Sequence, residues 1–196
     1  MSLKVILGSI AFFPLIALGA TSNVDIVKDA SDVTFLAVGR PSAIKIKGEK
    51  GKPEGHLSFS PDGKTEGEIK VDLDQFVTGI SMRDRHMKEK YLETQKEGFR
   101  YAIIKVTKVE FPADFWSSQK TGEYPFVGSL TLHGAKKDVA GKIKIDERKA
   151  DSLKGNSNFT IKLTDYGIQI PSFSGITVAE NVDVQVSFDA RTSSVK

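Results

Sequence analysis

Apolar and polar residues alternate with a period of two along most of this chain. Val, Ile, Leu or Phe occupies every second position, with charged, amide or hydroxyl side chains between, in the stretches 44–47, 69–73, 142–145, 159–164 and 182–188. Successive side chains of a β-strand point to opposite faces of a sheet, so this pattern predicts strands with one buried face and one wet face. Such strands favour an antiparallel sheet.

Turn-forming residues separate the alternating stretches. Ser60-Pro61-Asp62-Gly63 and Gly134-Ala135-Lys136 each lie between two of them, which predicts sequential hairpins. We expect eight or nine strands, at about 24–38, 42–48, 54–60, 65–74, 100–111, 123–133, 138–146, 154–165 and 180–190. Closing such a meander removes its exposed edges, so the predicted fold class is all-β, an antiparallel β-barrel of eight to nine strands.

One long segment, 81–98, departs from the alternation. Its sequence, SMRDRHMKEKYLETQKEG, is rich in helix formers, and apolar side chains recur at helical spacing from Met82 to Tyr91 before Gly98. We therefore expect a short helix and a loop that cap one end of the barrel.

The first twenty residues are unlike the rest of the chain. Lys4 is their only charged residue, residues 5–18 are nearly all apolar, and the small residues Gly19 and Ala20 follow. This arrangement is typical of a cleavable signal peptide, with cleavage after Gly19 or Ala20, export to the periplasm and a mature domain of residues 21–196. An uncleaved membrane anchor is the alternative, which the short apolar run disfavours.

Composition removes several classes of function. The chain has no cysteine, which excludes disulfides, thiol chemistry and a lipid-modified cysteine. Without residues 1–20 it keeps 27 basic and 25 acidic side chains, a balance that predicts no nucleic-acid partner. Lysine is locally in excess in two places, at Lys45, Lys47, Lys50 and Lys52 and at Lys136, Lys137, Lys142 and Lys144. We expect these lysines to lie on the solvent-facing side of strands and turns, and the alternative is transient contact with a membrane surface that has anionic lipids.

Catalytic motifs are missing from the sequence. It contains no G-x-S-x-G elbow, no phosphate-binding glycine loop and no H-E-x-x-H pair. The three histidines, His56, His86 and His133, fall in separate expected elements, so a triad or a metal site needs long-range convergence. We predict neither an enzyme nor a bound metal or cofactor.

Three segments carry a resemblance to a known family. They are TGISMRDRHM at 78–87, GSLTLHGAKKDV at 128–139 and FTIKLTDYGIQIPSFSGITVAENVDVQVSF at 159–188. Together they resemble the YceI-like family of bacterial lipid-binding proteins, whose T-G-x-x-x-R-D-x-H pattern recurs at Thr78, Gly79, Arg83, Asp84 and His86. The chain departs from the family at 92–106, LETQKEGFRYAIIKV, which lacks a usual proline and leaves the shape of the adjoining rim open.

The resemblance implies a secreted, lipocalin-like barrel that carries a long-chain isoprenoid lipid or an isoprenoid quinone without catalysing a reaction. The alternation agrees, because a barrel of about eight strands has room for its side chains or for one slender apolar ligand. The alternative is a structural or protein-interaction barrel of the cell envelope with a filled core, and a hydrolase or metal enzyme is a more distant third. Oligomeric state stays open, a dimer included.

The candidate ligand-binding residues form three groups. Inward strand positions, together with Phe99 just before the strand expected at 100–111, supply Leu57, Phe59, Ile69, Val71, Leu73, Phe99, Phe126, Leu130, Leu132, Phe159 and Ile161; the helical segment supplies Met82, Arg83, His86 and Met87; the apolar connection 165–179 supplies Tyr166 and Phe173. Arg83 or Arg85 can present a guanidinium to a pyrophosphate or quinone oxygen at the barrel mouth. The alternative is an arginine paired with Asp84 that clamps the helix, and the 165–179 connection either plugs a barrel end or lines the entry.

Overall fold

The computed structural model describes residues 21–41, 43–61, 63–173 and 175–195, and the expected signal peptide lies outside them. Its strands are β1 (Thr21–Ile26), β2 (Asp32–Arg40), β3 (Ile44–Gly51), β4 (Pro53–Phe59), β5 (Thr65–Asp72), β6 (Tyr101–Val109), β7 (Gly122–Leu132), β8 (Ala135–Arg148), β9 (Ser152–Lys162), β10 (Ser172–Phe173), β11 (Ile176–Val178) and β12 (Asn181–Val195). The helix α1 (Ser81–His86) continues into a π-helical turn at Met87–Tyr91, and 3-10 turns occupy Lys28–Ala30, Leu73–Gln75 and Leu163–Tyr166.

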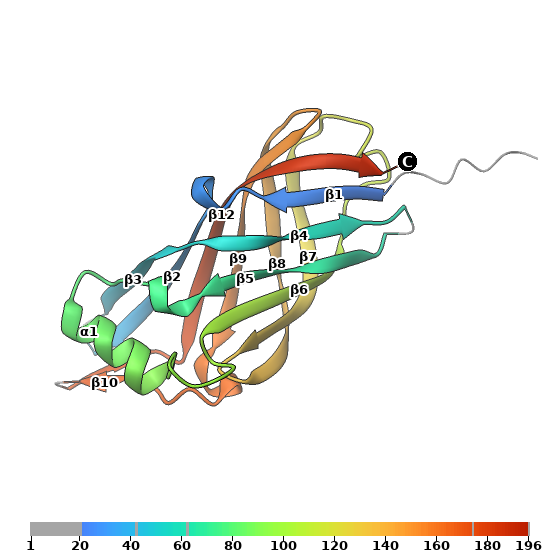
Figure 1. Cartoon of the computed structure of the whole chain (residues 1–196). Helices are drawn as coiled ribbons and strands as arrows, with labels where there is room; N and C mark the ends of the chain where they lie inside the picture. Colours follow the sequence, from blue (N-terminus) through green and yellow to red (C-terminus); the bar gives the residue numbers. More distant parts are fainter. Residues whose placement is uncertain (1–20, 42, 62, 174, 196) are drawn as a thin grey trace, which may run out of the picture.

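The strands form a closed antiparallel barrel. Following the hydrogen bonds, the order is β1, β4, β5, β6, β7, β8, β9 and β12, and β12 pairs with β1 to close the ring. The tilted wall is seen from the side in Figure 1, with α1 lying across one end. The prediction of an all-β barrel with one short helix is therefore confirmed. No helix among the described residues is long and apolar enough to cross a membrane.

The expected single strand at 24–38 is wrong, because the chain breaks it into β1 and β2 at the 3-10 turn Lys28–Ala30. Both pieces pair with β12 and occupy one row of the barrel, while β3 and β4 share the next row. Ser31, fully buried, holds the break: its hydroxyl donates to the carbonyl of Val27 at 2.9 Å and accepts from the amide of Asp189 at 3.0 Å. The wall therefore has eight rows of strands.

Alternation places side chains as predicted. Ile69 and Val71 face the interior, and between them Lys70 points outward, where its ammonium lies 3.1 Å from the carboxylate of Glu54. The same phase holds in β9, where Phe159 and Ile161 face inward. Buried apolar side chains thus come from every second position of the wall, as a half-buried sheet requires.

The β7–β8 hairpin turns on two residues, His133 and Gly134, since Leu132 pairs directly with Ala135. Their φ angles are 51° and 75°, which is the left-handed pair that a type I′ turn needs. Glycine adopts this conformation without steric cost, so its expected role at a hairpin is confirmed. The turn begins one residue earlier than predicted, and Ala135 already belongs to β8.

Two different structures cover the two ends of the barrel. At one end lie α1, the β10–β11 hairpin and the C-terminal end of β2, which pairs with β11 (Figure 1). We call this end the mouth. At the other end, which we call the closed end, the β6–β7 connection, residues 110–121, folds over the barrel.

Candidate functional site

The barrel encloses a cavity of about 650 Å³. Its wall is made almost entirely of Val, Ile, Leu, Phe, Met and Ala side chains, contributed by strands all around the ring. Ligand pockets in proteins commonly have volumes of roughly 300–1,000 Å³, so this space is large enough for a ligand and is not a packing defect. The interior of the barrel is therefore hollow and not filled by its own side chains.

Most of the sequence-predicted site residues lie on this cavity. The residues that line it are Leu57, Phe59, Ile69, Val71, Leu73, Met82, Arg83, His86, Met87, Phe126, Leu130, Leu132, Phe159, Ile161 and Phe173. Their inward phase in the strands, or their place on the helix at the mouth, brings them together. Their contact with a ligand stays a prediction.

Phe99 and Tyr166 do not line the cavity. Phe99 precedes β6 and is out of phase with the inward residues Ala102 and Ile104, and its ring packs on His133 with centroids 4.2 Å apart. Tyr166 is buried in the 3-10 turn after β9, where its carbonyl lies 3.0 Å from Nδ1 of His133. Both support the turns at the mouth end of the wall.

Sequence reasoning missed part of the lining. The cavity is also lined by four residues of β12, Val182, Val184, Val186 and Phe188. Their alternation with polar residues in the sequence was sufficient to predict this inward orientation. The row formed by β1 and β2 adds the inward residues Val24, Val33, Phe35 and Ala37, whose phase was obscured by the break between the two strands. Phe76 and Ile168 come from irregular segments and carried no periodic signal.

Aromatic side chains seal the closed end. The rings of Phe111 and Phe115 stack with centroids 3.9 Å apart, and Trp116 contacts Phe59 at 5.1 Å. Arg148 lies over this cluster, 4.5 Å from the Phe115 ring centroid, and donates from Nε to the carbonyl of Ser118 at 2.8 Å. Burial lowers the pKa of Arg148, but an arginine stays charged at neutral pH. Only Phe111 and Trp116 of the β6–β7 connection border the cavity.

Polar groups of the cavity gather at the mouth. Thr78, Arg83, His86 and Ser172 line it there, while Ser157 contributes a hydroxyl farther along the wall. Arg83 is the single charged side chain among the described residues of the lining. A mostly apolar cavity with a few polar groups at its opening suits an amphiphile whose apolar chain enters first.

The alternative interpretation, an arginine paired directly with Asp84, is replaced for Arg83 by a network centred on Thr78. Arg83 donates from Nε to the Thr78 hydroxyl at 2.7 Å and from Nη2 to the Thr78 carbonyl at 2.6 Å. Asp84 accepts from the Thr78 amide at 2.7 Å and from its hydroxyl. These contacts fix the start of α1, and because a guanidinium has five N–H donors, Arg83 keeps further donors for a ligand.

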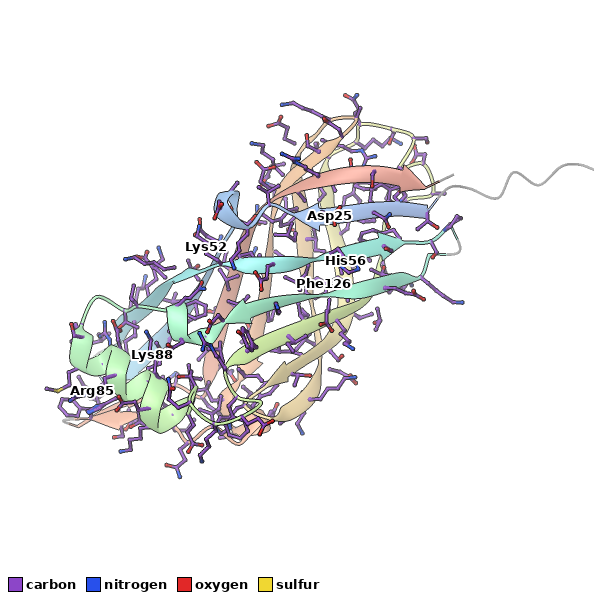
Figure 2. All side chains as sticks on the ribbon, viewed as in Figure 1. Asp25, Lys52, His56, Arg85, Lys88 and Phe126 are labelled. Carbon is purple, nitrogen blue, oxygen red and sulfur yellow. The ribbon has the colours of Figure 1, made fainter. Side chains whose placement is uncertain are left out.

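Arg85 lies outside the cavity. It is exposed on α1, close to Lys88 of the following turn (Figure 2), and neither residue lines the cavity. Of the two arginines considered for a headgroup, the structure places only Arg83 at the cavity.

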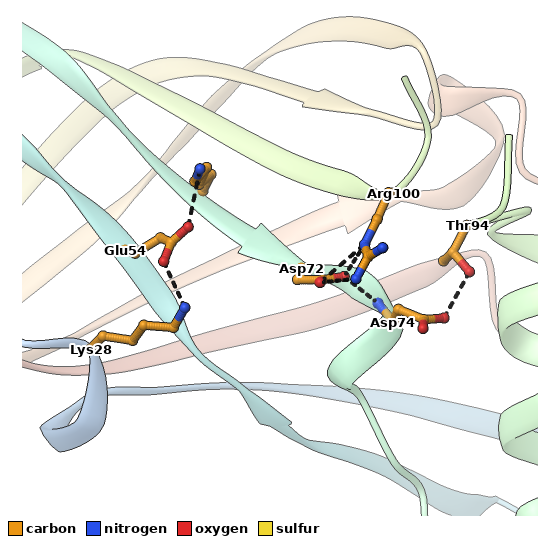
Figure 3. Close-up of polar contacts among 7 residues, drawn as sticks. Lys28, Glu54, Asp72, Asp74, Thr94 and Arg100 are labelled. Atoms are coloured by element: carbon orange, nitrogen blue, oxygen red, sulfur yellow. Dashed lines mark hydrogen bonds and ion pairs between the residues drawn. The ribbon is translucent and has the colours of Figure 1, made fainter. Parts of the chain in front are cut away.

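Two polar clusters hold the loops of the mouth. Asp72, at the end of β5, accepts from Nη2 of Arg100 at 2.8 Å and from the Asp74 amide, and Asp74 accepts from Thr94 at 3.0 Å (Figure 3). Burial by itself raises the pKa of Asp72, but the bonds from Arg100 and the Asp74 amide outweigh it and hold that pKa below its ordinary value.

The second cluster joins Glu93 to His133, with 3.0 Å between the carboxylate and Nε2. Hydrogen bonds from Lys96 and from His133 lower the pKa of Glu93. The segment after α1 is thereby tied to the β7–β8 turn.

The connection 165–179 supplies part of the entry. Its β10–β11 hairpin brings Pro171, Ser172 and Phe173 to the cavity, and Ser172 donates its amide to the Tyr91 hydroxyl at 3.3 Å. Ile168, just before the hairpin, is buried. The connection therefore both covers the barrel end and borders its opening. No cluster of three or more His, Asp or Glu suited to a metal occurs in the described part of the chain.

Comparisons with known proteins agree with this architecture. The sequence model of the YceI-like domain matches residues 25–190. A polyisoprenoid binding domain from Saccharophagus degradans, implicated in plant cell wall breakdown, is 17% identical with a TM-score of 0.68, over 87% of this chain and 98% of that one. BcnA of Burkholderia cenocepacia is 16% identical with a TM-score of 0.64, over 86% and 99%.

The YCEI protein of Campylobacter jejuni is 15% identical with a TM-score of 0.51, over 77% of this chain and 85% of that one. At such identities the structural likeness shows a shared fold. No curated protein matches the sequence significantly.

Proposed function

Because this chain belongs to the YceI-like family and encloses an apolar cavity, we propose that it is a non-catalytic carrier of one long isoprenoid lipid or isoprenoid quinone. The observation that carries the proposal is the lining itself: it is almost entirely apolar, and Arg83, the one charged side chain among its described residues, lies at the mouth. The polyisoprenoid binding named for the Saccharophagus degradans domain supports the same class of ligand.

The physical basis of binding is the burial of the chain. Each CH₂ group that leaves water contributes about 0.8 kcal/mol, so a chain of several isoprene units gains enough free energy to stay bound through dilution. The smooth apolar wall imposes little selection along the chain. Selectivity then depends on length, limited by the closed end at Phe111 and Trp116, and on the headgroup at the mouth.

The headgroup site proposed here is Arg83 with Thr78 and His86. A guanidinium donates charge-assisted hydrogen bonds to phosphate or carbonyl oxygens, each of about 1.5–3 kcal/mol. Arg83 is held in place by Thr78, so little side-chain freedom is lost when a ligand binds.

The same proposal places the mature carrier in the periplasm, since residues 1–20 have the pattern of a cleavable signal. Intact-mass measurement on envelope fractions tests it. A mature form beginning at Ala20 or Thr21 is the expected result, and a species that retains residues 1–19 in the inner membrane would contradict it.

Extraction of the purified native protein with organic solvent, followed by mass spectrometry, tests the carrier function. We expect one apolar lipid with an isoprenoid chain per barrel. Ser157 lines the cavity and its neighbour Asn158 is exposed, so Ser157→Phe should fill the lumen and expel the lipid while Asn158→Phe should retain it. A wild-type protein that yields no stoichiometric lipid would contradict the proposal.

A further inference from the structure

Large apolar side chains are exposed around the mouth of the cavity. The exposed fractions are 64% for Phe173, 54% for Ile80, 53% for Met82 and 39% for Ile44. All four border the cavity, although they come from β10, α1 with its preceding residue, and β3. The other exposed large apolar residues of the described chain, Tyr101 and Val127, lie on the outer wall and do not border it. We call Ile44, Ile80, Met82 and Phe173 the apolar rim.

Two of the three segments that carry the apolar rim are basic, and the third, β10 with Phe173, is uncharged. Residues 40–49 and 80–91 contain seven cationic side chains, Arg40, Lys45, Lys47, Arg83, Arg85, Lys88 and Lys90, against three carboxylates, Glu49, Asp84 and Glu89. Two of the carboxylates have partners: Asp84 accepts from Thr78 at the start of α1, and Glu49 lies 2.6 Å from the ammonium of Lys47. Arg85 on α1 and Lys88 in the π-helical turn that follows it both lie outside the cavity lining (Figure 2). The surroundings of the apolar rim therefore attract anions.

We propose that the mouth docks on an anionic lipid bilayer. Ile80, Met82 and Phe173 enter the boundary between headgroups and acyl chains, while Arg85, Lys88 and their basic neighbours contact the headgroups. The inference rests on the proposed carrier function, because a docked mouth lets an apolar chain pass between bilayer and cavity without crossing water.

The positive charge around the mouth favours an anionic bilayer, and not a second copy of this chain, as the partner that covers the apolar rim. A two-fold contact through the mouth would place the same basic segments of both copies face to face. An anionic surface instead meets them with opposite charge. Exposed apolar side chains next to exposed basic ones also match the composition of protein segments that lie in a membrane interface.

Flotation with lipid vesicles tests the docking. The vesicles are phosphatidylcholine alone, or phosphatidylcholine with a quarter phosphatidylglycerol. We expect wild-type protein to float with the anionic vesicles, and Ile80→Ser, Met82→Ser and Phe173→Ser combined to lower the partition coefficient at least tenfold. Val127→Ser is the matched control, since Val127 is 47% exposed away from the mouth, and it should float like wild type.

Charge reversal gives a second arm. Arg85→Glu with Lys88→Glu should lower binding to the anionic vesicles at least tenfold and leave binding to phosphatidylcholine unchanged. Lys105→Glu, on the outer face of β6, should change neither. Melting temperatures taken on the same preparations identify any variant that fails to fold.

Several outcomes would overturn the docking. They are wild-type protein that stays unbound, equal flotation of the serine variant, and light scattering that shows a dimer broken by the serine substitutions without any vesicle binding. Lipid extracted from the same wild-type preparation separates the two proposals. A loaded barrel that ignores vesicles defeats the docking and leaves the carrier function standing.

Discussion

The two ends of this barrel use similar apolar side chains for opposite purposes. At the closed end Phe115 is fully buried, stacked against Phe111 and covered by the guanidinium of Arg148. At the mouth Phe173 is 64% exposed, and its ring lies 6.1 Å from that of His86. The buried aromatic cluster stabilises the fold, whereas the apolar groups at the mouth stay largely exposed, as is common for surfaces that bind a partner.

The arginines of the two ends differ in the same way. Arg148 donates to the main-chain carbonyls of Ser118 and Trp116 and stacks on two rings, so its contacts belong to the protein. Arg83 is anchored to the hydroxyl and the carbonyl of Thr78 and borders the cavity. An arginine that is fixed and also borders an apolar cavity is suited to binding an oxyanion or a carbonyl.

The largest expected effect separates the two phenylalanines. Phe115→Ala should lower the free energy of unfolding by about 3–5 kcal/mol, because it opens a cavity in a packed aromatic cluster. Phe173→Ala should change it by less than about 0.5 kcal/mol, because an exposed ring leaves no void. Urea unfolding measures both, and similar losses for the two variants would show that the mouth is packed like the closed end.

A charge placed on the wall between the two ends should act on both stability and binding. Val71 lines the cavity, so Val71→Asp should cost roughly 2–4 kcal/mol and abolish lipid retention by leaving a carboxylate unpaired among apolar groups. Replacing the outward neighbour Lys70 by Asp should leave lipid retention intact. Unfolding curves and extracted lipid provide the readouts, and tolerance of both changes would refute the assigned strand faces.

Arg83 is expected to contribute in two ways that variants can separate. Arg83→Met should weaken lipid affinity roughly ten- to hundred-fold and also lower stability by about 1 kcal/mol through the Thr78 network. Thr78→Val should lower stability by a similar amount, although it leaves the Arg83 guanidinium in place. Arg85→Met should change neither lipid affinity nor stability. Lipid affinity and melting temperature are measured together.

Asp84→Asn should lower the melting temperature, because Asp84 accepts two hydrogen bonds from Thr78. Equal loss of affinity in Arg83→Met and Asp84→Asn would mean that Arg83 only positions the helix and does not hold a headgroup, because Asp84 belongs to the Thr78 network but does not line the cavity.

The smallest expected effect is a change in pH dependence at the mouth. The pKa of Asp72 is depressed in the folded state, so its stabilising contribution is present above the unfolded pKa of about 3.9 and is lost as pH falls through the lower folded value. Asp72→Asn should therefore lower stability at neutral pH and flatten the acid limb below about pH 4. Thermal melts from pH 2 to 7 check it; an unchanged acid limb would mean that Arg100 stabilises the carboxylate equally in the unfolded chain.

Local pattern by itself determined much of this fold. Side-chain direction in a strand depends only on position in the alternation, so the inward rows at 69–73, 159–163 and 182–188 could be predicted residue by residue. The helix at Ser81–His86 and the hairpin glycine at Gly134 also follow from short-range preferences of the backbone.

Tertiary structure decided what the alternation cannot encode. The residues at 24–38 alternate too weakly at Lys28–Ala30 to form one strand, and only pairing with β12 puts both halves in one row. Thr78 is the centre of the hydrogen-bond network at the mouth, because Arg83 and Asp84 of the helix both bond to it. Phe99 lies outside the cavity because its ring packs on His133, which is distant in sequence.

The hollow interior itself is a property of the whole ring. Whether the inward side chains touch one another across the barrel or leave a cavity between them depends on the barrel radius. That radius depends on the number of strand rows and their stagger. No single stretch of sequence carries that quantity, so alternation predicted an apolar interior while ring closure determined that about 650 Å³ of it stays open.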